Sequence, residues 1–470
     1  MIKTIKKIST TIIITVIYLL TKHKRRKQRE SEIKMTEWCE GIIALTFDLD
    51  IGGKIEEYYP ENIFEKYGEY FKQQLCFLAF PDVNSVEEDK QIKKKIYSTR
   101  FPIIQSCIYC HVLFVQIPKE DRRHSTQKSL IILSTKEEIQ PYHLFLEDLF
   151  PSFVESINEL AMFVQVVYMK FLSFPKYRLN VNFSLKFFGK RFPFIITERK
   201  VFPQFLLEYI PYLKTIWANL IAGETIIVYG NDITQITETV EYLSTLIKPL
   251  EYSGIIRSYV TINDPIIRSE KNLLIGTTNY MIVDIISKTR PVTIIHQNIE
   301  EHSFVRNIVD QRFDYLKTYS NPSLIYTEVE KCLYLETYEF LSIFNNFFFV
   351  KIPKMKSLID AFTTIDYTIE EVIEHMKSFQ FPSEKEEIYL SFINTTSFSK
   401  HISSLVVQLE SEHEKRLKEL LYSFNILQYS RNEIKQISMN LFSLSQKFKS
   451  INEIKSKCDE LIEQIINYMK

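Results

Sequence analysis

The pattern of apolar positions between residues 211 and 295 alternates between helical and strand spacing. Pro211 can open a helix and Gly223 can close it. Thr225 to Tyr229 is a short β-branched run, which is typical of a strand buried on both faces. The apolar positions before Gly223 recur at i, i+3, i+4, i+7 and i+8, one face of a helix: Leu213, Ile216, Trp217, Leu220 and Ile221.

The same alternation continues to Ile295. Asp232 followed by Gln235 predicts a second helix start, and this helix is expected to run to Pro249. A further helix is expected over about 278–287, and strands are expected over 259–262, 273–275 and 292–295. Helices that alternate with buried strands predict an α/β fold whose parallel sheet is covered on both faces.

The preceding stretch, from Glu40 onward, has a different order of elements. Two strands around a turn at 50–53 are followed by a helical pattern over 61–74, and Pro141 opens a long helix. Strands are expected between these helices at 75–80, 96–101, 103–117 and 129–133. Two strands, a helix, three or more strands and a helix is the longin-like order, so an N-terminal longin-like α/β module is predicted.

After Ile295 the apolar residues follow three-to-four spacing, which predicts a helical C-terminal region. The phenylalanine-rich segment 340–349 is interpreted as core rather than as a ligand pocket. Helices are expected over 304–316, 323–349, 369–379, 403–424, 434–447 and 451–469.

Three ordered elements of the central segment resemble motifs of DENN domains. IWANLIAGETIIV (216–228) resembles LWELVLLGEPLVV, KPLEYSGIIRSYVTIND (248–264) is similar to SPLxYxxxxRPYxTIxD, and LIGTTN (274–279) resembles ILGVTNP. GIIALTFDLDIGGKIEEYYP, the LCFLAFPD run that ends at Asp82, and residues 127–130 resemble the first, uDENN, module of the family. The match is best to the family-six branch, but Ser258 and Asn263 stand where the family more often has Pro and His.

The resemblance implies a guanine-nucleotide exchange factor for a Rab-family small GTPase in membrane trafficking. Such a protein would be cytoplasmic and recruited to endosomal or other trafficking membranes. Its longin and DENN lobes would clasp the GTPase, bind the switch regions and promote GDP release. That task needs a broad surface rather than covalent catalysis, so neither a catalytic residue nor a cofactor is expected.

Two alternative functions stay open. Arg122 and Arg123 lie in the loop 118–126, and related longin-DENN proteins place a GTPase-activating arginine in a comparable loop. Arg123 is therefore a candidate arginine finger, which would stabilise charge on the γ-phosphate; the other interpretation is a solvated loop arginine. The second alternative is a trafficking scaffold that binds a GTPase without exchanging its nucleotide.

We expect five segments along the chain. An N-terminal extension covers 1–34, a longin-like uDENN module 37–165, a connector 166–205, the central DENN α/β module 206–300, and a helical dDENN-like region 301–470. The aromatic and basic residues of 165–205 are interpreted as a buried inter-domain connection rather than a nucleic-acid site. Lys+Arg and Asp+Glu both number 58, and this zero net charge argues against a nucleic-acid partner.

The N-terminal extension has its own chemistry. Ile8 to Thr21 is a run of fourteen uncharged residues between two basic clusters. A spanning helix needs about 20 apolar residues, so this run is too short to cross a bilayer. It is either a basic, apolar tether that gives weak membrane association, or a disordered or mis-assigned extension.

Few residues suggest metal or redox chemistry. Cys107 and Cys110, followed by His111, have the letters of a haem-attachment or thioredoxin-like motif. They fall in a predicted strand, where residues three apart point to opposite faces, so small core residues are the preferred interpretation. No phosphate-binding loop, HExxH, GxSxG or Cys/His cluster is present, and no metal site is predicted.

Overall fold

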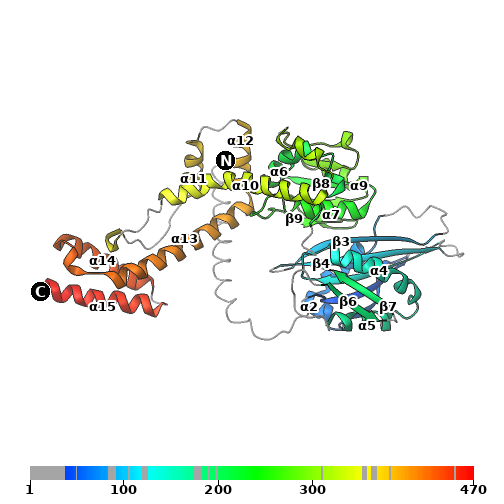
Figure 1. The fold of residues 1–470 in the computed structure, drawn as a ribbon, viewed down its shortest axis with the longest axis horizontal. Helices are drawn as coiled ribbons and strands as arrows, with labels where there is room; N and C mark the ends of the chain where they lie inside the picture. Colours follow the sequence, from blue (N-terminus) through cyan, green and yellow to red (C-terminus); the bar gives the residue numbers. More distant parts are fainter. Residues whose placement is uncertain are drawn as a thin grey trace. The chain divides into compact units, whose positions relative to one another are not determined.

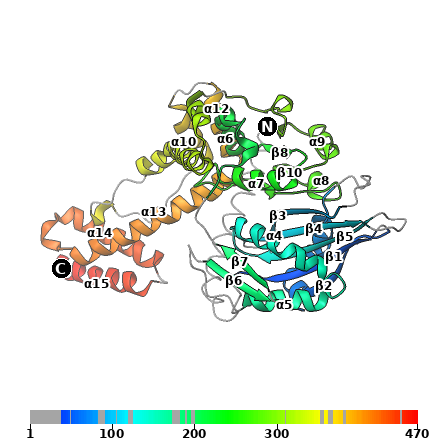
Figure 2. The ribbon, with the colours of Figure 1, turned by 45° about the vertical axis from the view of Figure 1, so that its right-hand side comes forward.

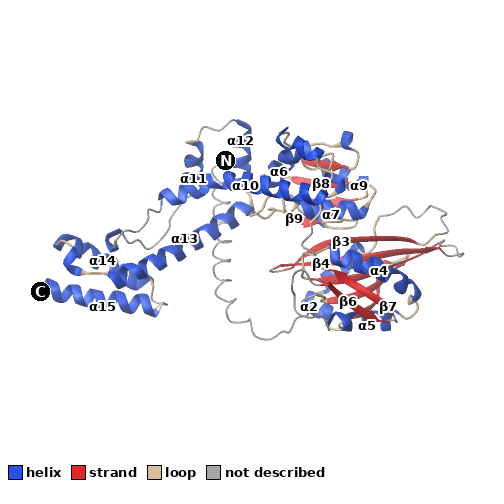
Figure 3. Cartoon of the chain, in the orientation of Figure 1, coloured by secondary structure: helices blue, strands red, loops and turns tan. Residues whose placement is uncertain are grey.

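The computed structural model describes residues 38–48, 50–82, 91–103, 106–118, 125–172, 182–187, 190–195, 200–308, 311–351, 357–360, 368–379, 383–448 and 451–470. These residues divide into two compact units, one ending at Thr337 and the other running from Tyr338 to Lys470. The first unit holds an antiparallel sheet and a parallel sheet, and the second is helical (Figures 1 and 3). The predicted fold class is therefore confirmed.

The antiparallel lobe is a five-stranded sheet in the order β2-β1-β5-β4-β3. Its strands are β1 Gly41–Asp48, β2 Gly52–Tyr59, β3 Lys93–Ile103, β4 Ser106–Pro118 and β5 Ser125–Ser134. Its helices are α2 Ile63–Tyr67, α3 Glu69–Leu78, α4 Gln140–Glu155 and α5 Leu160–Leu172. Figure 2 shows α4 and α5 beside this sheet.

Successive strand residues point to opposite sides of this sheet, and each side packs against its own set of helices. Ile42 and Ala44 join the core formed with α4 and α5. Ile43 and Leu45 join the core on the other face, which contains Phe71 of α3. The sheet thus lies between two helical layers.

A hairpin that the sequence did not predict adds to the first of these cores. It consists of β6 Asn182–Phe187 and β7 Lys190–Ile195. Phe194 is fully buried, and its ring lies 5.6 Å from that of Trp38 and 5.1 Å from that of Tyr142. Aromatic residues of the expected connector therefore belong to the core of the antiparallel lobe.

The parallel lobe has four strands in the order β11-β8-β10-β9, and all neighbouring pairs are parallel. The Asp232 carboxylate accepts from two backbone N–H groups and caps α7, as its spacing predicts. The strands are β8 Thr225–Tyr229, β9 Ile255–Arg257, β10 Leu273–Thr277 and β11 Val292–His296. The helices are α6 Leu213–Ile221, α7 Ile233–Leu243, α8 Ile266–Ser269 and α9 Tyr280–Ser287.

Four expectations about the residues before Thr337 are wrong. Residues 75–80 are not a strand, because Phe71, Leu75 and Leu78 form one buried face of α3. Residues 259–262 lie beyond β9, and Tyr259 is buried against the antiparallel lobe instead of extending the sheet. The helix α7 ends at Leu243 rather than at Pro249. The helix expected over 304–316 is replaced by a 3-10 segment, Gln311–Thr318.

The helical unit begins within α10, Pro322–Lys351, which starts in the first unit. Phe340 stacks on Tyr389 with ring centres 4.2 Å apart and contacts Phe392, which supports the core interpretation of the phenylalanine-rich segment. No helix among the described residues is long and apolar enough to span a membrane. The remaining helices are α11 Ile369–Lys377, α12 Ser383–Ile393, α13 Thr396–Ser423, α14 Arg431–Lys447 and α15 Asn452–Met469.

Candidate functional site

The two lobes of the first unit share a hydrophobic core where they meet. Tyr259, which follows β9, and Ile233 at the start of α7 pack into the core that lies under α3. The Tyr259 ring lies 5.6 Å from the ring of Tyr97 on β3. The Thr234 hydroxyl donates to the carbonyl of Ile96 at 2.6 Å. We call this contact between the lobes the joint.

A buried ion pair lies in the joint. Arg257 and Asp264 are 2 % and 1 % exposed, and their charged groups are 4.0 Å apart. The Arg257 guanidinium donates to the carbonyl of Arg100 at 2.7 Å and lies 4.1 Å from the ring centre of Phe101. Burial raises the pKa of Asp264 and lowers that of Arg257, although each group attracts the other. Arg257 of the parallel lobe is thus bound to β3 of the antiparallel lobe.

A second ion pair, between Arg100 and Glu241, also lies in the joint. The Arg100 guanidinium lies 3.0 Å from the Glu241 carboxylate on α7. The Ser258 hydroxyl donates to the same carboxylate. Burial raises the pKa of Glu241, and the attraction of Arg100 opposes that shift. Ser258, a departure from the DENN motif, therefore has a defined role, because a proline there could not donate this bond.

Asp82 connects α3 to the parallel lobe. Its backbone N–H donates to the Tyr259 hydroxyl at 3.0 Å. Its carboxylate accepts from the Ile262 N–H at 3.2 Å and from the Asn279 side chain at 3.1 Å. These partners lie 177 to 197 positions away along the chain, so sequence spacing alone could not reveal them. The motif residues Asp82, Arg257, Tyr259 and Asn279 all lie in the joint.

Exposed apolar side chains occur on both lobes, in segments that lead toward or contact the residues next to Asp82. Tyr280 and Met281, which follow Asn279 at the start of α9, are 63 % and 62 % exposed. Phe47 at the end of β1, Ile51 in the turn after it and Phe77 on α3 are also exposed. Phe47 contacts Phe80, two residues before Asp82, with ring centres 5.4 Å apart. We call these five side chains the joint surface.

The joint surface continues along the carboxyl edge of the parallel sheet. Tyr229 ends β8, and its ring lies 5.9 Å from Tyr280 and 4.9 Å from His296 at the end of β11. Parallel α/β sheets bind their ligands at the carboxyl ends of the strands. The position of the joint surface at this edge makes it the candidate functional site.

A serine, a histidine and a glutamate also meet near the joint. The Ser98 hydroxyl lies 2.9 Å from His143 Nε2, and His143 Nδ1 lies 3.6 Å from the Glu238 carboxylate. Ser98 is fully buried, and His111 Nδ1 lies 2.7 Å from the same hydroxyl. A substrate therefore has no access to this hydroxyl, and the group connects α4, β3 and α7 rather than forming a hydrolytic triad.

No protein-family model matches the chain. The chain is similar to DENND6 proteins. It is 21% identical to mouse Protein DENND6B over 302 residues, which cover 52% of this chain and 51% of that protein. It is 23% identical to mouse Protein DENND6A over 282 residues, 48% of this chain and 45% of that one.

The alignment with a third relative covers a smaller share of both proteins. The chain is 25% identical to the Protein DENND6 homolog of Dictyostelium discoideum over 177 residues, 37% of this chain and 24% of that protein. The chain thus spans about half the length of the two mouse relatives and about a quarter of the Dictyostelium one. The similarity agrees with the family branch that the sequence motifs indicate.

Other candidate residues are placed as follows. Arg122 and Arg123, like the extension 1–34, lie outside the described residues. Cys107 and Cys110 lie on β4 as expected, and both are free thiols. Burial raises the pKa of Cys110 to about 12, so this thiol stays protonated near neutral pH. Within the described ranges no group of His, Cys, Asp and Glu side chains could hold a metal ion.

Proposed function

We propose that this protein is a guanine-nucleotide exchange factor for a Rab-family small GTPase, and that the GTPase binds at the joint surface. The observation that carries the proposal is the position of the DENN-like motif residues. Asp82, Arg257, Tyr259 and Asn279 hold two lobes together beside exposed apolar side chains from both. The similarity to DENND6 proteins supports the same function.

The proposed mechanism is differential binding. A small GTPase that binds its nucleotide with about picomolar affinity has a binding free energy of roughly −16 kcal/mol, which opposes nucleotide release. A factor that binds the nucleotide-free conformation more tightly shifts the equilibrium toward release. Exposed Tyr280 and Met281 are residue types enriched in protein interfaces. They would anchor the GTPase, while the joint keeps both sides of the surface in position.

The direct test is release of a fluorescent GDP analogue from a complete panel of Rab proteins. We expect the full chain to accelerate release from one Rab or a small group of Rabs at micromolar concentration. Acceleration of none, with stable binding to one of them, would replace exchange by the scaffold function.

The same panel tests the arginine finger. If Arg123 activated GTP hydrolysis, Arg123→Ala would lower the stimulated rate by a factor of about 10³ or more. Arg122→Ala, the neighbouring substitution in the same loop, is the matched control. We expect neither variant to alter nucleotide exchange, and we expect no stimulated hydrolysis with the unsubstituted chain.

One negative charge placed on the joint surface is expected to slow nucleotide exchange. Met281→Asp should lower kcat/KM for exchange by roughly 10- to 100-fold, because a carboxylate would be desolvated in the interface. Folding should be unaffected, since an acidic residue in the first turn of α9 interacts favourably with the helix dipole. Met439→Asp on α14 is the matched control, because Met439 is 67 % exposed. Equal loss of exchange in both variants would contradict the assignment of the joint surface.

Membrane recruitment remains a proposal that concerns the extension 1–34. If its apolar run and basic clusters tether the protein, the full chain should co-sediment with anionic liposomes. A chain that starts at Met35 should stay in the supernatant. Equal sedimentation of the two chains would exclude the tether.

A further inference from the structure

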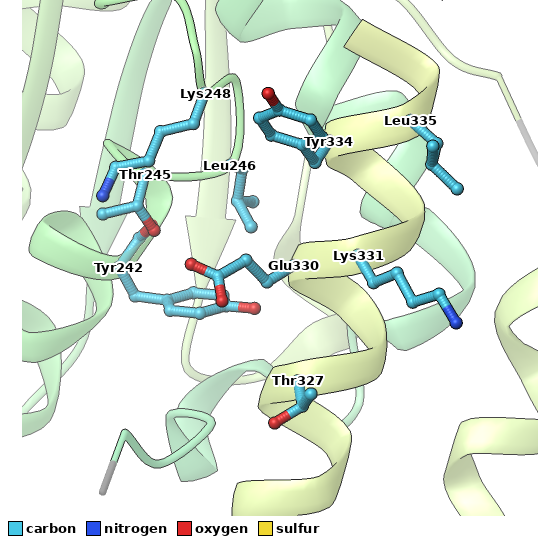
Figure 4. Close-up of a pocket in the computed structure, with 9 residues that line it drawn as sticks. All are labelled: Tyr242, Thr245, Leu246, Lys248, Thr327, Glu330, Lys331, Tyr334 and Leu335. Carbon is cyan, nitrogen blue, oxygen red and sulfur yellow. The ribbon is translucent and has the colours of Figure 1, made fainter. Parts of the chain in front are cut away.

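A pocket of about 470 Å³ lies between the segment around the C-terminal end of α7 and one side of α10. Figure 4 shows Tyr242, Leu246 and Lys248 on one side, and Glu330 and Tyr334 of α10 on the other. The remaining lining residues are Thr245, Thr327, Lys331 and Leu335. The volume is within the usual range for a bound ligand or an inserted peptide side chain.

Tyr242 has an unused hydrogen-bonding group in this pocket. Its ring is fixed by Phe202 and Tyr326, each with ring centres 5.2 Å away. Its hydroxyl is buried and has no hydrogen-bond partner, and Figure 4 shows it directed toward α10. Burial raises the pKa of Tyr242, so the hydroxyl stays protonated and can donate. A buried hydroxyl without a partner carries a free-energy cost that a bound acceptor would remove.

Among the described residues, the pocket is lined by one glutamate that is paired and by two lysines that are not. Glu330 is already paired, because its carboxylate lies 3.5 Å from the ammonium group of Lys200. Lys248 and Lys331 are exposed, and neither forms an ion pair with a described residue. The pocket rim therefore attracts negative charge. Tyr334 and Leu335 are exposed on α10 beside it and offer apolar contact area.

We propose that this pocket binds a short acidic peptide segment of a partner protein. One apolar side chain of the segment would pack between Leu246 and Tyr334. A backbone carbonyl would accept the Tyr242 hydroxyl bond, and acidic residues would pair with Lys248 and, on the outer side of α10, with Lys331. Tyrosines in well-packed pockets are typical anchors of protein recognition, and lysines at the rim complement an acidic partner.

This site is separate from the proposed GTPase surface. The joint surface reaches Tyr229, at the end of the strand that precedes α7, and the pocket lies at the other end of that helix. An α-helix of 11 residues is about 16 Å long. A peptide in the pocket would leave the joint surface open, so one molecule could hold a partner and a GTPase together.

The experiment selects from a displayed library of random twelve-residue peptides on the full-length protein. The strongest binder is then synthesised with a fluorescent label, and its Kd is measured by anisotropy. We expect the selected peptides to share an apolar residue flanked by Asp or Glu. Lys248→Glu combined with Lys331→Glu should weaken binding at least about 30-fold, because two attractive charges become repulsive.

Two variants separate recognition from folding. Tyr242→Phe should weaken the same peptide about 3- to 10-fold, the usual effect of one lost hydrogen bond. It should leave Tm unchanged, because this hydroxyl has no partner in the free protein. Lys271→Glu combined with Lys288→Glu is the charge-matched control, and it should leave peptide binding intact.

Each outcome decides the proposal. It is overturned if the library yields no binder, if the binders lack acidic residues, or if the control charge reversal weakens binding as much as the pocket reversal. Nucleotide release from the Rab panel should be unchanged in the Lys248 and Lys331 double variant. The peptide-binding assay does not depend on nucleotide exchange, so it tests the pocket even if the protein exchanges no nucleotide.

Discussion

Replacing Arg257 with leucine is expected to lower the free energy of unfolding of the first unit by about 3 to 5 kcal/mol. The substitution leaves the Asp264 carboxylate buried without its countercharge. It also removes the hydrogen bond that the guanidinium donates to the Arg100 carbonyl across the joint. Urea denaturation of the full chain, monitored by tryptophan fluorescence, measures the loss. Arg268→Leu on α8 is the control and should cost under about 0.5 kcal/mol, because Arg268 is exposed.

The cost at Arg257 should depend on pH in a defined direction. Burial already raises the pKa of Asp264, and Arg257 is the charge that opposes this shift. Without Arg257 the folded variant keeps a proton on Asp264 at pH values where the unfolded chain has lost it. The unfolded state then binds fewer protons, so the variant loses stability as pH rises above the ordinary aspartate pKa.

The difference between parent and variant should therefore be smaller near pH 5 than near pH 8. Asp264→Asn added to Arg257→Leu should recover part of the loss and flatten this pH dependence. A difference that is the same at both pH values would show that Asp264 is not the group left uncompensated.

The sequence predicts the parallel lobe well where local pattern and tertiary role agree. The runs at β8, β10 and β11 are short and apolar, and each becomes a strand within two residues of the expected bounds. The failure at 259–262 has a physical reason. Tyr259 and the residues after it have strand composition, but tertiary context overrides propensity when such residues are buried against another lobe. The strand expected over 75–80 failed for a similar reason, because a short apolar run suits a buried helix such as α3 as well as a strand.

The joint could be predicted only in part. The motifs singled out Asp82, Tyr259 and Asn279, but their mutual contacts cross more than 170 positions of the chain. Such contacts follow from the packing of one lobe on the other, which spacing does not specify. The joint surface was missed for a related reason. Tyr280 and Met281 extend the apolar composition of α9, and only the fold shows that no described element covers them.

The predicted burial of Trp217 is confirmed, and the structure adds a neighbour on α10 that apolar spacing does not indicate. The sequence predicts that Trp217 packs against the sheet of the parallel lobe. The residue is buried, but its indole N–H donates to the Thr337 hydroxyl on α10 at 2.9 Å. Lys214, one turn earlier, pairs with Glu336 of α10 at 2.9 Å. The whole of α6 is buried except Lys214, so apolar spacing alone could not distinguish the side that faces the sheet.

Trp217→Ala is expected to cost about 3 to 5 kcal/mol, because it opens a large cavity between α6 and α10. A domain has only about 5 to 15 kcal/mol of stability, so the folded fraction near physiological temperature should fall. The corresponding decrease in Tm should be at least about 6 °C, measured by calorimetry on the full chain. Trp217→Phe keeps an aromatic ring and loses the indole hydrogen bond, so it should cost less than the alanine variant.

The two variants also test where the GTPase binds. Because Trp217 is buried and bonded to α10, it should influence nucleotide exchange only through the folded fraction. Exchange rates divided by the folded fraction should then match the parent for both variants at a temperature below their transitions. A Trp217→Ala protein that melts like the parent but no longer accelerates nucleotide release would place Trp217 in the GTPase interface. That result would move the binding surface from the joint to α6 and α10.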